Sequence, residues 1–224
     1  MTGKRIFDDW PERYDRWFET PLGETVLAHE RKLILDMLRP GRGELILDAG
    51  SGTGIFTGAF IARGADVVGL DISFAMLRRA AEKNTTLAGW GVAADMTKLP
   101  FCDCAFDKSV PVTAIEFIAD AGRAVAELFR VTKRGGSVVV ATLNSLSPWA
   151  DRRLADARRD RSSVFNRVIF RSPAELLALA PVAGVARTVV HFGKEDPPAD
   201  WGRIEREGRG SERGAFVAAL WEKP

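Results

Sequence analysis

Three glycines alternate with other residues in the segment LDAGSGTGIF, residues 47–56. Gly50, Gly52 and Gly54 permit backbone angles that other residues avoid, and they let another molecule come close to the main chain. When such a turn joins a strand to a helix, its N–H groups lie at the positive end of the helix. The segment therefore predicts a ligand site, and Asp48, the carboxylate in front of the glycines, bears on the ligand class.

Two ligand classes fit a glycine turn of this kind: a dinucleotide pyrophosphate, and a nucleoside that carries an amino-acid tail. The dinucleotide fingerprint G-x-G-x-x-G fails, because Ile55 stands at the third glycine position counted from Gly50. Asp48 would repel a pyrophosphate but attract an ammonium group. The sign of its charge favours the nucleoside with an amino-acid tail, and the alternative for Asp48 is an anion at the helix N-terminus.

Strands and helices alternate along the chain from residue 45 onward, which indicates a mostly parallel sheet with helices on both faces. The expected strands are 44–50, 65–71, 91–95, 106–112, 137–143, 185–192 and 214–222. The expected helices are 55–64, 74–84, 120–133 and one that opens with a capping box at 172–175. Ligands bind such sheets at the carboxyl ends of the strands, near the point where the strand order reverses. The glycine segment follows the first strand and so meets this rule.

These motifs resemble those of the class I S-adenosylmethionine-dependent methyltransferases. Residues 45–57 look like the first motif of that family, VVGLDIS (67–73) like the second and AADMTKLPF (93–101) like the third. The segments FDKSVPVTAIEFIAD and ELFRVTKRGGSVVVATLN resemble its ubiquinone/menaquinone-biosynthesis-like subgroup, methyltransferase type 11. The resemblance implies an α/β fold: a Rossmann-like seven-stranded, mostly parallel sheet of order 3-2-1-4-5-7-6. Its last strand is antiparallel, helices cover both faces, and an N-terminal helical cap is added.

The resemblance also implies roles in binding S-adenosylmethionine. Asp71 would accept hydrogen bonds from the ribose hydroxyls, which suits one carboxylate facing two donors. Asp95 would pair with the adenine amino group beside Met96, and Ile72 and Met76 would supply apolar surface. The full predicted set is Tyr14, Asp48, Gly50, Ser51, Gly52, Thr53, Gly54, Asp71, Ile72, Met76, Ala94, Asp95, Met96 and Val110.

Aromatic residues gather near the N-terminus. In related methyltransferases a Tyr-Asp pair here folds over the cofactor, so Tyr14 is predicted to touch the methionine end. Trp10, Trp17 and Phe18 are predicted to line the acceptor pocket. The alternative is simple packing of an amphipathic helix onto the sheet.

Two glutamates are the candidate catalytic residues. Glu30 lies in the middle of the apolar face expected of a helix over 24–38, and an unpaired buried carboxylate is costly. Glu30 therefore has a cationic partner or faces a wet pocket beside the cofactor. Glu116 follows the fourth strand and would hold or deprotonate the acceptor, or merely begin a helix. A base is needed only if the acceptor has to lose a proton.

The connection 144–171 is long for a link between a strand and a helix, which is often a sign of function. Its segment SPWADRRLADARRDRSS (147–163) carries five arginines against three aspartates. One interpretation is a lid anchored by Trp149, with an arginine that meets a carboxylate or phosphate on an acidic substrate. The alternative is a solvated helical face. Asn144 points toward the acceptor side on topology alone.

Composition excludes several other classes of protein. The net charge is +2, from 32 basic and 30 acidic side chains, and no basic extension favours nucleic acid. No apolar run approaches the ~20 residues of a membrane span. Cys102 and Cys104 are too few for a disulfide framework or a structural zinc site, so a cytoplasmic protein is expected. With His29 and His191 as the only histidines, neither a Ser-His-Asp set nor metal clustering is visible.

A single methyltransferase domain over residues 1–224 is therefore expected, as a monomer or homodimer. It divides into a helical cap (1–43), a cofactor-binding core (44–143), a lid or insertion (144–171) and a C-terminal helix with strands (172–224). The expected reaction is in-line transfer of a methyl group from S-adenosylmethionine to a small molecule, without a metal and with S-adenosylhomocysteine as product. The alternatives are a non-catalytic protein that binds the same cofactor and a nicotinamide-dependent oxidoreductase.

Overall fold

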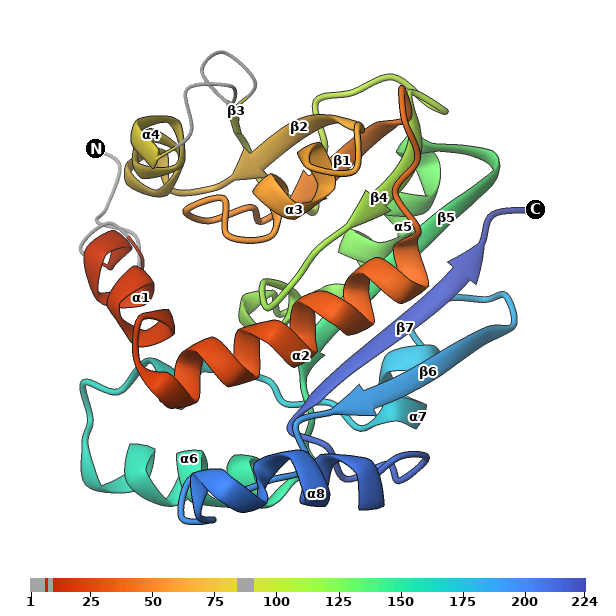
Figure 1. Cartoon of the computed structure of the whole chain (residues 1–224). Helices are drawn as coiled ribbons and strands as arrows, with labels where there is room; N and C mark the ends of the chain where they lie inside the picture. Colours follow the sequence, from red (N-terminus) through yellow and green to blue (C-terminus); the bar gives the residue numbers. More distant parts are fainter. Residues whose placement is uncertain (1–6, 8–9, 84–90) are drawn as a thin grey trace.

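A seven-stranded sheet with helices on both faces forms the centre of the computed structural model, which describes residues 7, 10–83 and 91–224 (Figure 1). The strands are β1 (Leu45–Ala49), β2 (Asp66–Asp71), β3 (Gly91–Ala93), β4 (Phe106–Val110), β5 (Thr132–Leu143), β6 (Gly184–Val189) and β7 (Phe216–Glu222). Their order is β3-β2-β1-β4-β5-β7-β6, and β7 runs antiparallel to both β5 and β6. The predicted fold class and strand order are confirmed.

Helices cover the two faces of the sheet through two separate apolar clusters. The helices are α1 (Pro11–Phe18), α2 (Pro21–Leu38), α3 (Thr57–Ile61), α4 (Phe74–Lys83), α5 (Ala121–Val131), α6 (Pro148–Arg159), α7 (Pro173–Leu177) and α8 (Trp201–Glu207). One cluster joins the sheet to α5 and α7, and the other joins it to α2 and α3. Burial of apolar surface at about 25 cal/mol per Å² makes these clusters the main source of stability. No helix in the described ranges has the length and hydropathy needed to cross a bilayer.

Two elements differ from the sequence prediction in length. The helix expected over 55–64 is reduced to α3, because Gly50, Gly52 and Gly54 all have positive φ and the turn they form continues to Phe56. Strand β5 begins at Thr132, before the Gly135-Gly136 pair, and its register with β4 shifts between Phe106 and Lys108. The capping box predicted at 172–175 is present and starts α7.

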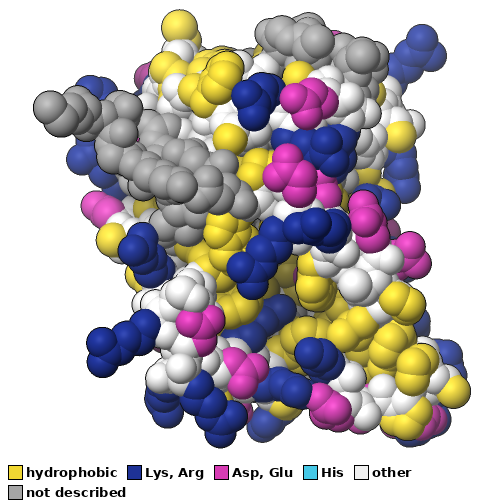
Figure 2. Space-filling view, turned by 90° about the vertical axis from the view of Figure 1, so that its left-hand side faces the viewer, with side chains coloured by type: hydrophobic (Ala, Val, Ile, Leu, Met, Phe, Trp, Pro, Cys, Tyr) yellow, Lys and Arg dark blue, Asp and Glu magenta, His cyan; other side chains and the backbone are white. Residues whose placement is uncertain are grey.

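The carboxyl ends of the parallel strands face α1, the first turns of α2, and the 144–171 connection (Figure 1). The insertion carries α6 and the short 3₁₀ helix η3 (Val164–Arg167), and a second 3₁₀ helix, η2 (Ile115–Phe117), follows β4. A third apolar cluster packs Val26 of α2 against Trp201 of α8, with Trp149 of α6 at its margin. This edge of the sheet, seen face on in Figure 2, shows Lys and Arg side chains around an apolar recess.

Candidate functional site

The glycine loop crosses the carboxyl end of β1 and is held by the next strand. The backbone N–H groups of Gly50 and Ser51 donate to the Leu70 carbonyl at 2.6 and 2.9 Å. A Cβ at Gly50 would collide with the Cβ of Ala114, whereas a Cβ at Gly52 would meet no heavy atom of the described residues within 4 Å. Gly50 is therefore required by packing within the protein, and Gly52 presents bare backbone to open space.

Asp71 fixes the loop from the end of β2. Its Oδ2 accepts a hydrogen bond from Gly52 N at 2.9 Å, and its Oδ1 accepts one from Ser73 N at 2.8 Å. Only 8% of Asp71 is exposed. Asp71 therefore holds the glycine loop at Gly52.

Two further predicted residues, Asp95 and Met96, follow β3. Asp95 is exposed and its Oδ1 accepts from both the N–H and the hydroxyl of Thr97, each at 2.8 Å. Met96 is buried, and its methyl group lies next to Gly50. Ile72, 42% exposed, follows β2. Asp71 and Met96 therefore lie beside the glycine loop, and Ile72 and Asp95 follow β2 and β3. We call the predicted cofactor surface formed by the glycine loop and these four residues the donor crevice.

Asp48 points into the protein. Thr57, the first residue of α3, donates its hydroxyl to Asp48 Oδ2 at 2.6 Å. Burial raises the pKa of Asp48 to about 7, the Thr57 bond opposes the rise, and the charge of Asp71 adds to it. The contact with Thr57 is the one expected if Asp48 is an anion at the helix N-terminus, and direct contact with a cofactor stays a prediction.

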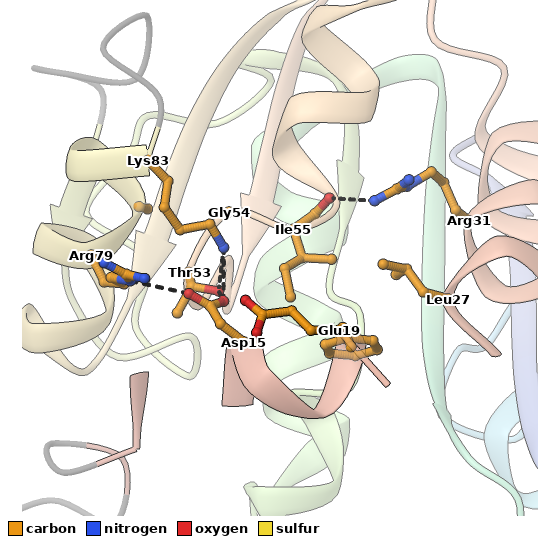
Figure 3. A pocket seen from close by; sticks show the side chains of 11 residues that line it. Asp15, Glu19, Leu27, Arg31, Thr53, Gly54, Ile55, Arg79 and Lys83 are labelled. Atoms are coloured by element: carbon orange, nitrogen blue, oxygen red, sulfur yellow. Dashed lines mark hydrogen bonds and ion pairs between the residues drawn. The ribbon is translucent and has the colours of Figure 1, made fainter. Parts of the chain in front are cut away.

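Helix α1 is clamped onto the glycine loop by Asp15. One oxygen of Asp15 accepts from the Thr53 hydroxyl at 2.6 Å and from Lys83 Nζ at 2.7 Å, and the other accepts from Arg79 Nε at 3.1 Å (Figure 3). These hydrogen bonds outweigh the effect of burial and lower the pKa of Asp15. We call Asp15, Thr53, Arg79 and Lys83 the α1 clamp. A groove of about 480 Å³ adjoins it, with Phe18, Leu27, Arg31 and Ile55 among its other lining residues.

Tyr14 of α1 interacts through its side chain with Thr113, which follows β4. Thr113 has a positive φ of 47°. Such a backbone angle is uncommon for a threonine. Burial raises the pKa of Tyr14, and the nearby carboxylates of Glu30 and Glu116 add to the rise. Tyr14 therefore lies near the two predicted catalytic glutamates.

Glu30 and Glu116 are both buried and close enough to interact. Glu30 is 6% exposed and Glu116 is 1% exposed. Burial raises the pKa of Glu30 to about 8 and that of Glu116 to about 7. The Thr142 hydroxyl donates to Glu116 Oε2 at 3.1 Å, while the Glu30 carboxylate accepts no hydrogen bond from any described residue. Helix α2 and the 3₁₀ helix η2 thus place two buried carboxyl groups close to each other.

Arg153 of α6 completes this group from the inserted segment. Its guanidinium lies 5.1 Å from the ring centre of Trp149 and 5.3 Å from that of Phe165. Burial lowers the pKa of Arg153 to about 10, and Glu30 and Glu116 oppose that change. Its Nη1 is buried and has no hydrogen-bond partner within the described chain. We call the buried group formed by Tyr14, Glu30, Glu116 and Arg153 the polar chamber.

Hydrogen bonds hold the inserted segment against the chamber. Ile169 N donates to the Glu116 carbonyl at 2.8 Å, and Arg171 Nη1 donates to the Ile115 carbonyl at 3.3 Å. Trp149 Nε1 donates to the Phe192 carbonyl at 2.7 Å, which fixes the ring beneath Arg153. The inserted segment is therefore hydrogen-bonded to the turn that carries Glu116.

Three more of the residues predicted for the acceptor or the cofactor lie outside the groups described above, and their roles stay predictions. Asn144 is fully buried, and its amide nitrogen donates to the carbonyls of Glu212 and Gly214 while its oxygen accepts from Leu146 N. Its amide is thus occupied in joining β5 to the loop before β7. Trp17 is 36% exposed, and Met76 lies on the buried face of α4 with Leu77 and Ala80.

The remaining predicted residues lie around α1, in the glycine loop, and at strands β3 and β4. Trp10 lies beside Phe7, which contacts Phe117 after β4, and Phe18 packs edge-on against Tyr14. Ser51, Thr53 and Gly54 belong to the glycine loop, with Thr53 in the α1 clamp. Val110 is fully buried in β4, and Ala94 is partly buried after β3.

Comparison with known proteins identifies the family. A methyltransferase-domain family matches residues 47–140. A demethylmenaquinone methyltransferase from Thermobifida fusca is 37% identical over 149 residues, which cover 63% of this chain and 61% of that protein. A malonyl-[acyl-carrier protein] O-methyltransferase from Pseudescherichia vulneris is 31% identical over 196 residues, 78% of this chain and 77% of that protein.

This chain belongs to the S-adenosylmethionine-dependent methyltransferases. The fold agrees with this: the crystal structure of a SAM-dependent methyltransferase, a possible histamine N-methyltransferase, from Thermotoga maritima has a TM-score of 0.78. It is 22% identical, and the match covers 98% of this chain and 99% of that one. This chain spans between 53% and 61% of the length of four demethylmenaquinone methyltransferases that it matches.

The crevice of this methyltransferase fits S-adenosylmethionine. Gly52 leaves its backbone open, Asp71 places a carboxylate at the end of β2, and Met96 with Ile72 supplies apolar surface beside them. These residues would hold the cofactor, and their individual roles stay predictions. No group of three His, Cys, Asp or Glu residues within the described ranges is arranged to hold a metal ion.

Sequence reasoning missed three parts of the methyltransferase site. Arg153 is one of five arginines in the polar segment 147–163, and nothing in the spacing distinguishes it from its neighbours. Thr113 gives no local signal for its backbone angle. Asp15 is the second residue of the Tyr-Asp pair, but its partners Arg79 and Lys83 lie more than sixty residues away along the chain. The sequence therefore does not reveal the contacts of Asp15.

Proposed function

We propose that this methyltransferase moves a methyl group from S-adenosylmethionine to a small-molecule acceptor held in the polar chamber. The observation that carries the proposal is the contact of Gly50 with Ala114. Ala114 lies between Thr113 and Glu116, so the glycine loop and the polar chamber share a border. The donor crevice and a space lined with titratable groups are therefore adjacent, as group transfer requires.

When bound, the cofactor supplies a sulfonium methyl group, which is transferred by in-line displacement. The chain itself would contribute binding, alignment and the exclusion of water. The α1 clamp holds a helix over the loop, and the inserted segment closes the chamber. Glu116, with a pKa of about 7, is partly ionised near neutral pH and would accept a proton from an acceptor that has to lose one. Glu30, with a pKa of about 8, is mostly protonated at that pH and would accept a proton only after it has ionised.

The names of the relatives point to different acceptors. They include demethylmenaquinone methyltransferases, malonyl-[acyl-carrier protein] O-methyltransferases and a possible histamine N-methyltransferase. These names support methyl transfer to an organic acceptor, but they do not agree on its chemistry. The acceptor of this chain is therefore best sought from its own side chains.

Calorimetric titration with S-adenosylhomocysteine, followed by an acceptor screen with a labelled methyl donor, tests the proposal. We expect binding of the adenosyl compound and incorporation of label into a small molecule. Binding without turnover on any acceptor would favour the non-catalytic alternative. Binding of a nicotinamide nucleotide in place of the adenosyl compound would reject the proposal.

A further inference from the structure

The groove beside the α1 clamp is a cavity that the proposed function does not use. It is lined by residues of α1, α2, α4 and the glycine loop, and its volume is about 480 Å³. Small-molecule sites commonly have volumes of about 300–1,000 Å³. Thr53 and Gly54 of the glycine loop line it, but neither Asp71 nor Met96 does, and no member of the polar chamber does. We call this cavity the clamp groove.

Arg31 of α2 lines the clamp groove with a guanidinium group that has few partners. Its Nη2 donates to the Ile55 carbonyl at 3.3 Å, which is long for a hydrogen bond of this type. Its Nε is buried with no partner in the described chain, and its Nη1 donates to no described residue. A guanidinium group has five N–H donors, and leaving buried donors unpaired costs free energy. Arg31 therefore has donor capacity for an acceptor group in the groove.

The other charges of the clamp groove leave Arg31 without a carboxylate partner. Figure 3 shows Arg31 at one end, Arg79 and Lys83 at the other, and Asp15 and Glu19 between them. Asp15 is bonded to Arg79 and Lys83 at 3.1 and 2.7 Å. Glu19 is exposed and forms no ion pair in the part of the chain that the structure describes. Three basic and two acidic side chains leave one positive charge in excess, which a ligand with a single negative charge would balance.

Apolar side chains form the rest of the clamp groove. Phe18, Leu27 and Ile55 are partly buried, and Ala80 is buried. Leu27 and Ile55 pack against the apolar cluster that joins the sheet to α2 and α3. Covering such surface stabilises a complex by about 25 cal/mol per Å², so the groove suits a ligand with an apolar body. A carboxylate carries one negative charge and matches the planar fork of a guanidinium, whereas a phosphate monoester carries about −1.5 to −2.

We propose that the clamp groove binds a small organic monocarboxylate, with its carboxylate at Arg31 and its apolar body against Phe18, Leu27 and Ile55. The site is separate from the proposed acceptor site, and the inference does not rest on the proposed function. Glu19 opposes the ligand, because its negative charge lies in the same groove.

Isothermal titration calorimetry with two matched series of ligands tests the proposal. One series is hexanoate, hexylamine and hexyl phosphate, and the other is 3-phenylpropionate, 3-phenylpropylamine and 3-phenylpropyl phosphate. We expect at least one carboxylate to bind about tenfold more tightly than its matched amine and than acetate, which has the charge without the apolar body. It should also bind more tightly than its matched phosphate. No binding of either carboxylate, or equal binding of an amine or of acetate, would overturn the inference.

A pair of variants with opposite effects assigns the site. Arg31→Gln should lower the affinity for the carboxylate at least about tenfold, as expected for hydrogen bonds to a charged group. Glu19→Gln should raise it about threefold, the size of one exposed charge interaction, and a folding defect would not produce this gain. Lys32→Gln and Glu24→Gln are the matched controls, because both residues are exposed on α2 and neither lines the groove. Unchanged affinity in Arg31→Gln, or a loss in Glu19→Gln, would contradict the assignment.

Repeating the titrations in saturating S-adenosylhomocysteine separates the clamp groove from the cofactor site. We expect the carboxylate to bind in its presence. Loss of carboxylate binding would show that the acid occupies the cofactor site, and the inference would fall. If S-adenosylhomocysteine itself does not bind, the proposed function fails, and the wild-type and variant titrations without it still decide whether the groove holds the carboxylate.

Discussion

The donor crevice and the polar chamber touch at Gly50 and Ala114, yet they are built differently. The crevice uses backbone N–H groups and carboxylates from one stretch of chain, between Asp48 and Met96. The chamber uses side chains that come from distant segments, with Glu30 on α2, Glu116 after β4 and Arg153 in the insertion. The predicted donor site thus comes from the ends of β1, β2 and β3, whereas the proposed acceptor site needs α2, the turn after β4 and α6.

The largest effect expected in the crevice comes from a pair of glycine substitutions. Gly50→Ala meets Ala114 and a φ of 82°, so we expect a loss of about 2–4 kcal/mol in the free energy of unfolding. Gly52→Ala meets only its φ of 55° and should cost about 1–2 kcal/mol, while it obstructs the cofactor. Urea unfolding and titration with S-adenosylhomocysteine measure the two effects. Equal losses of stability would show that packing does not distinguish the two glycines.

The affinity of an Asp71 variant for S-adenosylhomocysteine tests the predicted donor crevice. We expect Asp71→Ala to weaken S-adenosylhomocysteine binding by about 1.5–3 kcal/mol, the range for hydrogen bonds to charged groups. Because Asp71 also binds Gly52 N and Ser73 N, its unfolding midpoint has to be measured beside the titration. An unchanged affinity would reject the ribose assignment.

The chamber should make the protein less stable in alkali. Burial raises the pKa of Glu30 from 4.5 to about 8, so the stability contributed by its neutral form is fully present below about pH 4.5 and is lost as the pH rises through 8. We expect a loss of about 2 kcal/mol between pH 5 and pH 9, or roughly 4–8 °C in the midpoint. Glu30→Gln should flatten this profile and Glu24→Gln should not. An unaltered slope in Glu30→Gln would place the titrating group elsewhere.

The α1 clamp should give the smallest effect. Arg79 and Lys83 are about one-third exposed, so we expect Asp15→Asn to cost only about 1 kcal/mol of stability. The difference from wild type should shrink near 1 M salt, where the Debye length is about 3 Å. Asp36→Asn, which breaks the exposed pair with Lys32, is the matched control and should have almost no effect. A larger cost at Asp36 than at Asp15 would contradict the role of the clamp.

The fold could be predicted because its signals are local. The strand order followed from the motif resemblance, and the capping box at 172–175 marked the start of α7 from four residues alone. The length of α3 could not be predicted, because the turn made by the three glycines takes up residues that a helical pattern would claim. The extension of β5 to Thr132 likewise depends on its pairing with β4.

The site was predictable only where burial could be read from periodicity. Glu30 stood out because a helical face places it among apolar residues, and its burial is confirmed. Arg153 did not, since a helix rich in arginine and aspartate has the pattern of a solvated face. Asn144 lies at the expected edge of the sheet, but its amide is used by Glu212 and Gly214, which no spacing along the chain could reveal.

Ala114 has a consequence for how the two substrates are aligned. A single methyl group separates the loop that would carry the donor from the turn that leads to Glu116. That methyl group acts as a spacer: a larger residue at 114 would push the loop away, and a glycine would let it sink toward the turn. Methyl transfer depends on the distance between donor and acceptor. The Ala114 side chain would therefore set the distance between the two proposed sites.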